Sequence, residues 1–131
     1  MSITLNPGRQ EPIVARVDFD YTQLSNGHTV PAIQVPAGAV ITHGGIVINT
    51  PWNSATTDTL GIGDAASPSR YHTAINAQAT GYTALQPTGF PYSSMSQVAV
   101  SWIGTGATPT AGSATLWVEY LVIGRALFSE G

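Results

Sequence analysis

Glycine and proline interrupt this chain so often that no long helix fits between them. The 131 residues include 14 Gly and 9 Pro. Proline inside a helix removes a hydrogen bond and clashes with the preceding turn, and glycine weakens helix interiors. The longest stretches free of both residues are 13–26, 69–80, 92–103 and 113–123. A chain divided in this way is expected to fold as short strands joined by turns, which is the pattern of an all-β domain.

The first of these stretches and the residues after it predict two strands. Apolar side chains occupy every second position of 13–21, the period of a strand with one buried face. Asn26-Gly27 tolerates positive φ and favours a tight hairpin turn. The returning segment 28–35 contains Pro31, which cannot donate a ladder hydrogen bond and therefore indicates an edge strand.

The middle of the chain predicts further strands and turns. Gly44-Gly45 interrupts a β-rich run and suggests a bulge or a bend between sheets. Ser67-Pro68 favours a single helical turn through residue 72, because proline suits the first helical position. Strand patterns cover 39–49, 57–63, 75–80, 97–102 and 113–123, and a Pro- and Gly-rich loop covers 86–95. Seven or eight short strands of this kind are typical of a β-sandwich, a jelly roll or a small barrel.

The length predicts one domain, 12–131, preceded by an arm, 1–11. The arm is polar, contains a Pro-Gly pair, and is expected to be ordered only by contact with a neighbour. The first residues lack the basic and apolar segments of a secretory signal, and no run approaches the ~18 apolar residues of a membrane span. We therefore expect the protein to be made in a cytoplasm and to leave it only within a larger particle.

Charged residues are unusually scarce. They make up 8% of the chain, against roughly 25% in an average soluble domain. Such a surface is poorly protected against self-association, so either it is neutral and sticky without consequence or neighbouring subunits cover much of it. The four arginines are far apart in the sequence and there is no lysine. Nucleic acid and anionic membranes both require clustered basic residues, and we expect neither as a partner.

No set of residues has the pattern of a catalytic site. The absence of cysteine excludes disulfides, thiolate metal sites and cysteine nucleophiles, and the absence of lysine excludes Schiff-base chemistry. Neither G-x-S-x-G nor S-x-x-K occurs. Asp18 and Asp20 lie on one side of a strand, as a carboxylate pair for glycoside hydrolysis could. An outward polar face explains them more simply.

Signals for a cofactor or a metal are weak. Residues 61–66 fit the loose G-x-G-x-x-A pattern, but a dinucleotide site needs a helix directly after the glycines, and the following Ser-Pro leaves no room for a long one. His28, His43 and His72 contain no H-x-H pair, although three histidines could meet in space. We expect no cofactor, no metal and no enzymatic activity.

Aromatic residues supply candidates for a binding surface. Trp102 alternates with Val98 and Val100 and is expected in the core. Trp52 and Tyr92 lie in loops beside prolines, where their rings could contact a protein partner or stack on a sugar.

The last strand is apolar on both faces. One face is expected to be core and contains Ala114, Leu116, Val118, Tyr120 and Val122. The other face contains Thr115, Trp117, Glu119, Leu121 and Ile123, whereas the solvated face of an antiparallel sheet is usually polar. Either the strand is covered on both faces within one subunit, or its second face meets another chain. Candidate interface residues are therefore Trp117, Glu119, Leu121 and Ile123, together with the loop residues Trp52 and Tyr92.

Three segments resemble those of small structural proteins of tailed bacteriophages. They are 35–41 (VPAGAVI), 57–71 (TDTLGIGDAASPSRY) and 112–125, which contains the last strand. The resemblance covers roughly residues 28–125 and implies a jelly-roll capsid decoration (cement) protein. Such a protein sits on the outer capsid surface, forms a homodimer or homotrimer, and bridges neighbouring major capsid protein subunits. The resemblance implies no catalytic residues.

The sequence thus predicts an all-β, antiparallel β-sandwich of the jelly-roll type with an extended N-terminal arm. The leading functional hypothesis is a capsid decoration protein. Two alternatives stay open: a receptor- or glycan-binding module of a phage tail or head fibre, and a cupin-like metal enzyme.

Overall fold

The computed structural model describes Leu5 and residues 9–123. The strands are β1 (Ile13–Asp20), β2 (Thr29–Val35), β3 (Ala39–Thr50), β4 (Thr57–Gly63), β5 (His72–Asn76), β6 (Gly81–Ala84), β7 (Ser96–Thr105) and β8 (Ser113–Val122). The described chain contains one short 3-10 helix, Tyr21–Gln23, which is capped by Asp20. None of its helices is long and apolar enough to cross a membrane.

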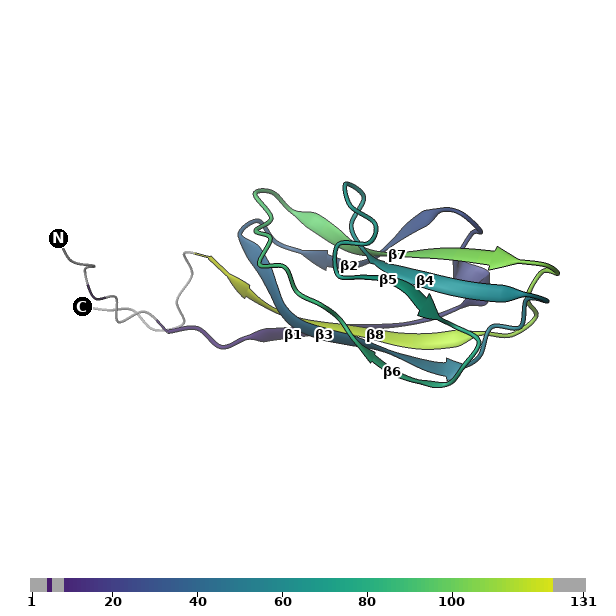
Figure 1. Ribbon diagram of the computed structural model, residues 1–131. Coiled ribbons are helices and arrows are strands. Elements are labelled where there is room, and N and C mark those ends of the chain that lie inside the picture. The colour runs from purple at the N-terminus through teal and green to yellow at the C-terminus, as the bar shows by residue number, and fades with distance from the viewer. Residues whose placement is uncertain (1–4, 6–8, 124–131) are drawn as a thin grey trace.

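The strands form two antiparallel sheets of four, stacked as two layers (Figure 1). The β1 sheet has the order β1-β8-β3-β6, and the β2 sheet has the order β2-β7-β4-β5. This eight-stranded double-sheet arrangement is a jelly roll, as predicted. The first four strands alternate between the two sheets along the chain, and so do the last four. Figure 1 shows that β1 begins and β8 ends at the same end of the sandwich; we call it the terminal end.

The core lies between the two sheets and follows the period-2 pattern of the strands. In β8 the alternate residues Ala114, Leu116, Val118 and Tyr120 are buried, and Val98, Val100 and Trp102 are buried in the same way in β7. These apolar faces confirm the core expected from the sequence. Burying each large aliphatic side chain stabilises the fold by roughly 1.5–3 kcal/mol.

The predicted hairpin between the first two strands is wrong, although its turn forms. Gly27 has φ +79°, and the His28 backbone N–H donates to the Ser25 carbonyl at 3.0 Å. However, β1 pairs with β8 while β2 pairs with β7. The turn therefore carries the chain from one sheet to the other. The Asn26 side chain fixes this crossing, since it both donates to and accepts from the backbone of Gly104.

Other local expectations have mixed outcomes. Pro31 lies on an edge strand, as predicted. The register of β3 against β8 shifts between Ile41 and His43, just before Gly44-Gly45, so the bulge is next to the glycines and β3 stays in one sheet. The expected helical turn after Ser67 is instead a hydrogen-bonded turn that leads into β5. The strand expected at 75–80 ends at Asn76, and the short β6 was not anticipated.

Part of the predicted arm is attached to the domain. The Gln10 side-chain amide donates to the Val122 carbonyl at 2.8 Å, and its oxygen accepts from the Val122 N–H at 2.6 Å. A single side chain thus takes the place of a strand residue beside the end of β8. Leu5 is 91% exposed, and residues 1–4 and 6–8 of the arm lie outside the described residues.

Candidate protein interface and the loop network beside it

The outward face of β8 is not covered by any other element of the described chain. β8 lies between β1 and β3 in its sheet. On its outward face Trp117 and Glu119 are partly exposed, Leu121 is 37% exposed, and Ile123 just beyond the strand is 65% exposed. Within the part of the chain that the structure describes, the subunit therefore leaves this face partly open. That another chain covers the outward face of β8 stays a prediction.

Polar and charged side chains on this outward face contact one another. His43 on β3 lies opposite Glu119, with 3.3 Å between Nδ1 and Oε1. On β1, Arg16 and Asp18 pair at 3.0 Å, and Asp18 also accepts from Thr115. Both acidic side chains thus have a basic neighbour on the same face. Arg16 and Asp18 are close enough to balance each other's charge, and Glu119 has the His43 imidazole as its neighbour.

Aromatic side chains lie at the centre of the same face. Trp117 is opposite Arg16 on one side and Gly45 on the other. A Cβ at Gly45 would collide with the ring of Tyr82, so the glycine provides the space in which this ring lies. Tyr82 is 56% exposed. Partly exposed tryptophan and tyrosine are enriched at protein interfaces.

Apolar groups continue from β8 towards the terminal end. Leu121 is opposite Val40 on β3, and Val40 forms an isolated bridge with Pro91 in the loop before β7. The Tyr92 N–H donates to the Ala39 carbonyl at 3.0 Å. This loop therefore extends the β1 sheet by one short segment beyond β3.

Trp52 and Tyr92 were expected to present their rings on loops, and the structure corrects this. Trp52 is 1% exposed and Tyr92 is 4% exposed. Trp52 packs 6.2 Å from Phe19 and against the backbone of Gly112. Both loops fold over the open ends of the sandwich, where a large ring closes the core. These two residues belong to the core of the subunit, and the glycan-binding hypothesis loses the rings on which it was based.

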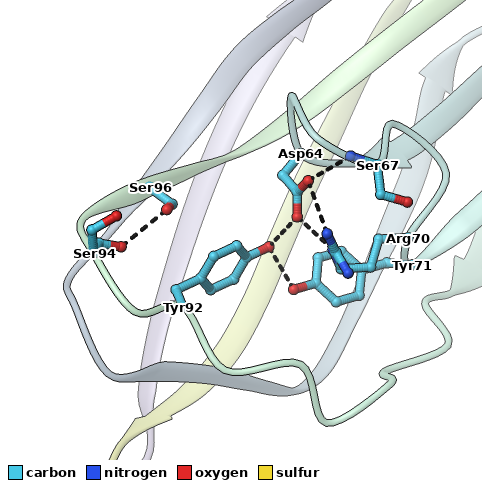
Figure 2. A network of polar contacts seen from close by, with 7 residues as sticks. All are labelled: Asp64, Ser67, Arg70, Tyr71, Tyr92, Ser94 and Ser96. Carbon is cyan, nitrogen blue, oxygen red and sulfur yellow. Dashed lines mark hydrogen bonds and ion pairs between the residues drawn. The ribbon is translucent and has the colours of Figure 1, made fainter.

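Tyr92 belongs to a buried polar network centred on Asp64, which directly follows β4 (Figure 2). Asp64 accepts four hydrogen bonds: from Arg70 Nε at 2.6 Å, Arg70 Nη2 at 3.3 Å, the Ser67 backbone N–H at 2.8 Å and the Tyr92 hydroxyl at 2.9 Å. The Tyr71 and Tyr92 hydroxyls are 2.7 Å apart. The network joins the loop between β4 and β5 to the loop before β7.

The electrostatics of this network follow from its burial and its bonds. The side chains of Asp64 and Arg70 are 6% and 16% exposed. Burial alone would raise the pKa of the Asp64 carboxyl, but the bonds from Arg70, Ser67 and Tyr92 outweigh burial and hold the pKa below its usual value. Burial and the neighbouring Tyr71 and Asp64 raise the pKa of Tyr92 well above its usual value. At neutral pH the pair is therefore ionised and the phenol is protonated.

A second buried carboxylate, Asp58, lies near the start of β4 and has no cation. It is 1% exposed and accepts from Trp102 Nε1, the Ser54 N–H and Gln78 Nε2, each at 2.9 Å. Burial would raise the pKa of Asp58, but these bonds outweigh burial and lower the pKa. Neither Asp58 nor Asp64 was among the site residues expected from the sequence. The available signal was an acidic residue inside the 57–63 strand pattern, Asp58, and another directly after it, Asp64.

The other candidate sites of the sequence have structural explanations. Gly61 and Gly63 belong to β4, which ends in a turn, so no helix N-terminus follows the G-x-G. His72 Nδ1 lies 2.7 Å from the Thr73 carbonyl oxygen. Asp18 and Asp20 engage Thr115 and the cap of the 3-10 helix. Within residues 9–123, no group of three or more His, Cys, Asp or Glu side chains could hold a metal ion.

Comparison with solved structures places the fold among phage capsid chains. No protein-family profile and no curated protein matches this sequence. A chain of the cyanophage Pam1 capsid is similar with a TM-score of 0.67 and 21% identity, over 93% of this chain and 91% of that chain. A chain of the Helicobacter pylori bacteriophage KHP30 capsid has a TM-score of 0.68 and 15% identity, over 94% of this chain and 96% of that chain. A chain of the Ralstonia phage GP4 capsid has a TM-score of 0.68 and 17% identity, over 96% of this chain and 93% of that chain. At these identities the comparison establishes a shared fold.

Proposed function

We propose that this protein is a structural component of a phage virion, specifically a capsid decoration protein. It would be made in the host cytoplasm, bind the outer surface of the major capsid shell as a homodimer or homotrimer, and bridge neighbouring subunits without catalysing a reaction. One observation carries the proposal: the jelly roll matches chains of three phage capsids over more than nine tenths of each partner. Those chains are therefore small subunits of about this length.

The outward face of the β1 sheet is the proposed contact surface. The surface consists of the aromatic and aliphatic side chains of Trp117, Leu121 and Ile123, together with the Glu119 carboxylate, which contacts the His43 imidazole. Burial of such a face in an assembly is consistent with the low charge of the chain, since residues covered by a partner need no charge for solubility. Trp117 lies at the centre of the face, where a binding hot spot is common.

Quantitative mass spectrometry of purified particles tests the assignment to the shell. A decoration protein is expected at a copy number comparable with that of the major capsid protein. A tail or head-fibre module is expected at a few to dozens of copies. Absence from particles, or a copy number of only a few to dozens, would overturn the decoration role. The second outcome would favour the receptor-binding alternative.

Leu121→Asp tests the contact surface. The side chain is 37% exposed in the subunit, so the variant is expected to fold, with an unchanged circular dichroism spectrum. A charge at the contact is expected to dissociate the oligomer in sedimentation experiments or to lower particle occupancy at least tenfold. Ile103→Asp is the matched control, because Ile103 is 58% exposed on the outward side of β7 in the other sheet. Full occupancy and oligomeric mass for Leu121→Asp would show that this face is solvated.

A further inference from the structure

Each sheet of the sandwich has two edge strands, and β1 is the edge that is least protected against pairing. β1 and β6 are the edges of one sheet, and β2 and β5 are the edges of the other. β2 contains Pro31 and a shift in its register with β7. β5 has five residues and a shift in its register with β4, and β6 has four residues. Proline, short length and irregular register all protect an edge from pairing with another chain.

β1 has none of these protective features. Its eight residues contain neither glycine nor proline, and its register with β8 is unbroken from Ile13 to Asp20. Outside that ladder, no backbone–backbone hydrogen bond engages β1 within the part of the chain that the structure describes. A regular edge strand presents a row of backbone N–H and C=O groups, so another strand can pair with it.

The apolar side of β1 is incompletely covered. Ile13, Ala15 and Val17 pack against the core but are only partly buried. An opening of about 240 Å³ lies between β1 and β2, and Val17, Phe19 and Val30 are among its lining residues. All of the lining residues that the structure describes are uncharged. Apolar groups that are left open along an edge favour burial against another chain.

The outward side of β1 has charged side chains, which usually discourage pairing at an edge. Arg16 and Asp18 lie on this side of Val17, one before it and one after it, and their side chains are 65% and 62% exposed. When two antiparallel copies of β1 are aligned at Val17, each Arg16 lies opposite the partner's Asp18. Opposite charges directly across an antiparallel pair stabilise the pairing. The charges of β1 are therefore complementary to those of a second copy.

The neighbouring registers lack this match. Alignment at Arg16 would place it opposite the partner's Arg16, and alignment at Asp18 would place it opposite the partner's Asp18. Like charges directly opposite each other destabilise a pair, and a slip of one residue would turn the apolar side of one strand outward. The 3-10 helix Tyr21–Gln23 ends the edge. The charges thus select the alignment at Val17, which pairs residues 14–20 of the two strands.

We propose that two copies of this protein form a homodimer by antiparallel pairing of β1 with the partner's β1, with Val17 on the two-fold axis. The pairing joins two four-stranded sheets into one sheet of eight strands. It also places the partly buried apolar side chains of the two strands against each other.

The dimer has a consequence for the proposed contact surface. Arg16 and Asp18 stay on the outward side in both subunits, so the outward faces of both β1 sheets lie on the same side of the joined sheet. The surface that contains Trp117 and Leu121 is then present twice on one side of the dimer, as a bridge between neighbouring capsid subunits requires. This consequence rests on the proposed function, whereas the pairing itself does not.

Sedimentation velocity of the purified full-length protein tests the pairing. At low ionic strength, where exposed charges are least screened, we expect a homodimer with a dissociation constant on the order of 10 µM. Arg16→Asp and Asp18→Arg each place like charges opposite each other twice, and each should weaken the dimer at least about tenfold. Ile103→Asp, on the outward side of β7, is the control and should leave the dimer unchanged. Circular dichroism verifies that every variant is folded.

An equimolar mixture of Arg16→Asp and Asp18→Arg tests the register and the partner together. In the mixed dimer an acid lies opposite a base at both sites, so the mixture should dimerise with about the wild-type affinity although neither variant does so alone. The proposal is overturned if the mixture stays monomeric, if the wild type is a monomer at about 100 µM, or if it is a trimer.

Cross-linking measures the alignment directly, because the chain has no cysteine. Val17→Cys should place two thiols on opposite strands with about 4.5–5.5 Å between their Cα atoms, which is within the range of a disulfide. Oxidised glutathione should therefore convert this variant to a covalent dimer. Val14→Cys is the control: Val14 is 62% exposed, but its copy in the partner subunit would lie about 20 Å away along the strand.

Equal cross-linking of Val14→Cys and Val17→Cys, or cross-linking of Val14→Cys alone, would overturn the alignment. All of these measurements use the free protein. Their failure would therefore reject the pairing, and the copy number in particles would still decide the capsid role.

Discussion

The two ends of β4 each have a buried aspartate, and the two are supported in different ways. Asp58 is held by neutral donors from Trp102, Ser54 and Gln78. Asp64 is held by a cation, Arg70, together with Ser67 and Tyr92. Both carboxylates join loops that are far apart in sequence. They differ in the charge of the group that compensates the buried carboxylate.

Two donors to Asp58, Ser54 and Trp102, line a hollow of about 320 Å³ at this end. A Cβ at Gly104 would lie 2.6 Å from the Trp102 ring and 2.8 Å from the Asp58 carboxylate, so the backbone packs directly on the buried acid. At the other end, two partners of Asp64, Arg70 and Tyr92, line a pocket of about 270 Å³ beside Phe90. Both ends of β4 thus combine a buried acid with a hollow at the surface, and they differ in the charge of the group that compensates the acid.

The largest expected effect is that of Arg70→Gln. It leaves Asp64 buried without its cation, and we expect the free energy of unfolding at pH 7 to fall by about 3 kcal/mol. In the wild type, the pKa of Asp64 is lowered by folding, so its stabilising contribution is present above the usual pKa of 3.8 and is lost as the pH falls through the lower pKa of the folded state. In the variant, burial without a cation is expected to raise the pKa of Asp64. Protonation of the carboxyl then removes the free-energy cost of burying its charge.

The difference between Arg70→Gln and wild type should therefore shrink as the pH falls from 7 to 4. Urea unfolding followed by tryptophan fluorescence measures it at each pH. The double variant Asp64→Asn with Arg70→Gln is the control, because it has no buried charge and should lose less stability at pH 7 than the two single variants together. A difference that stays constant over this pH range would show that Asp64 is adequately solvated without Arg70.

Asp58→Asn is expected to have a smaller effect, about 2 kcal/mol at pH 7. The amide places its NH2 group against a donor, from Ser54, Gln78 or Trp102, but it leaves no cation unpaired. Asp18→Asn is the control, since that carboxylate is exposed on β1, and it should change stability little. A larger loss for Asp58→Asn than for Arg70→Gln would reverse the comparison between the two ends.

Gln10→Ala should have the smallest effect, about 1 kcal/mol. The side chain makes two hydrogen bonds to Val122 at the terminal end, so its loss should expose the Val122 N–H to faster hydrogen exchange. Amide exchange of Val122 compared with that of Tyr120 measures this effect. Unchanged exchange at Val122 would mean that water or a neighbouring residue replaces Gln10 without cost.

Much of the fold could be predicted because a strand pattern depends only on its own residues. The alternation in β8 and β7 predicted which side chains are buried, and Pro31 predicted an edge strand. The sequence also indicated that the outward face of β8 is unusually apolar. These conclusions need no knowledge of distant segments, because a period of two assigns side chains to faces by local geometry.

Tertiary structure alone decided which strands pair and what the loops cover. The Asn26-Gly27 turn forms locally, but pairing of β1 with β8 and of β2 with β7 directs its two flanks into different sheets. Trp52 and Tyr92 occupy loops in the sequence, yet those loops close the ends of the core. The pocket also needs Arg70 and Phe90 to meet across two loops. The physical reason is that burial depends on the whole sum of long-range contacts, whereas turn and strand preferences depend on neighbours along the chain.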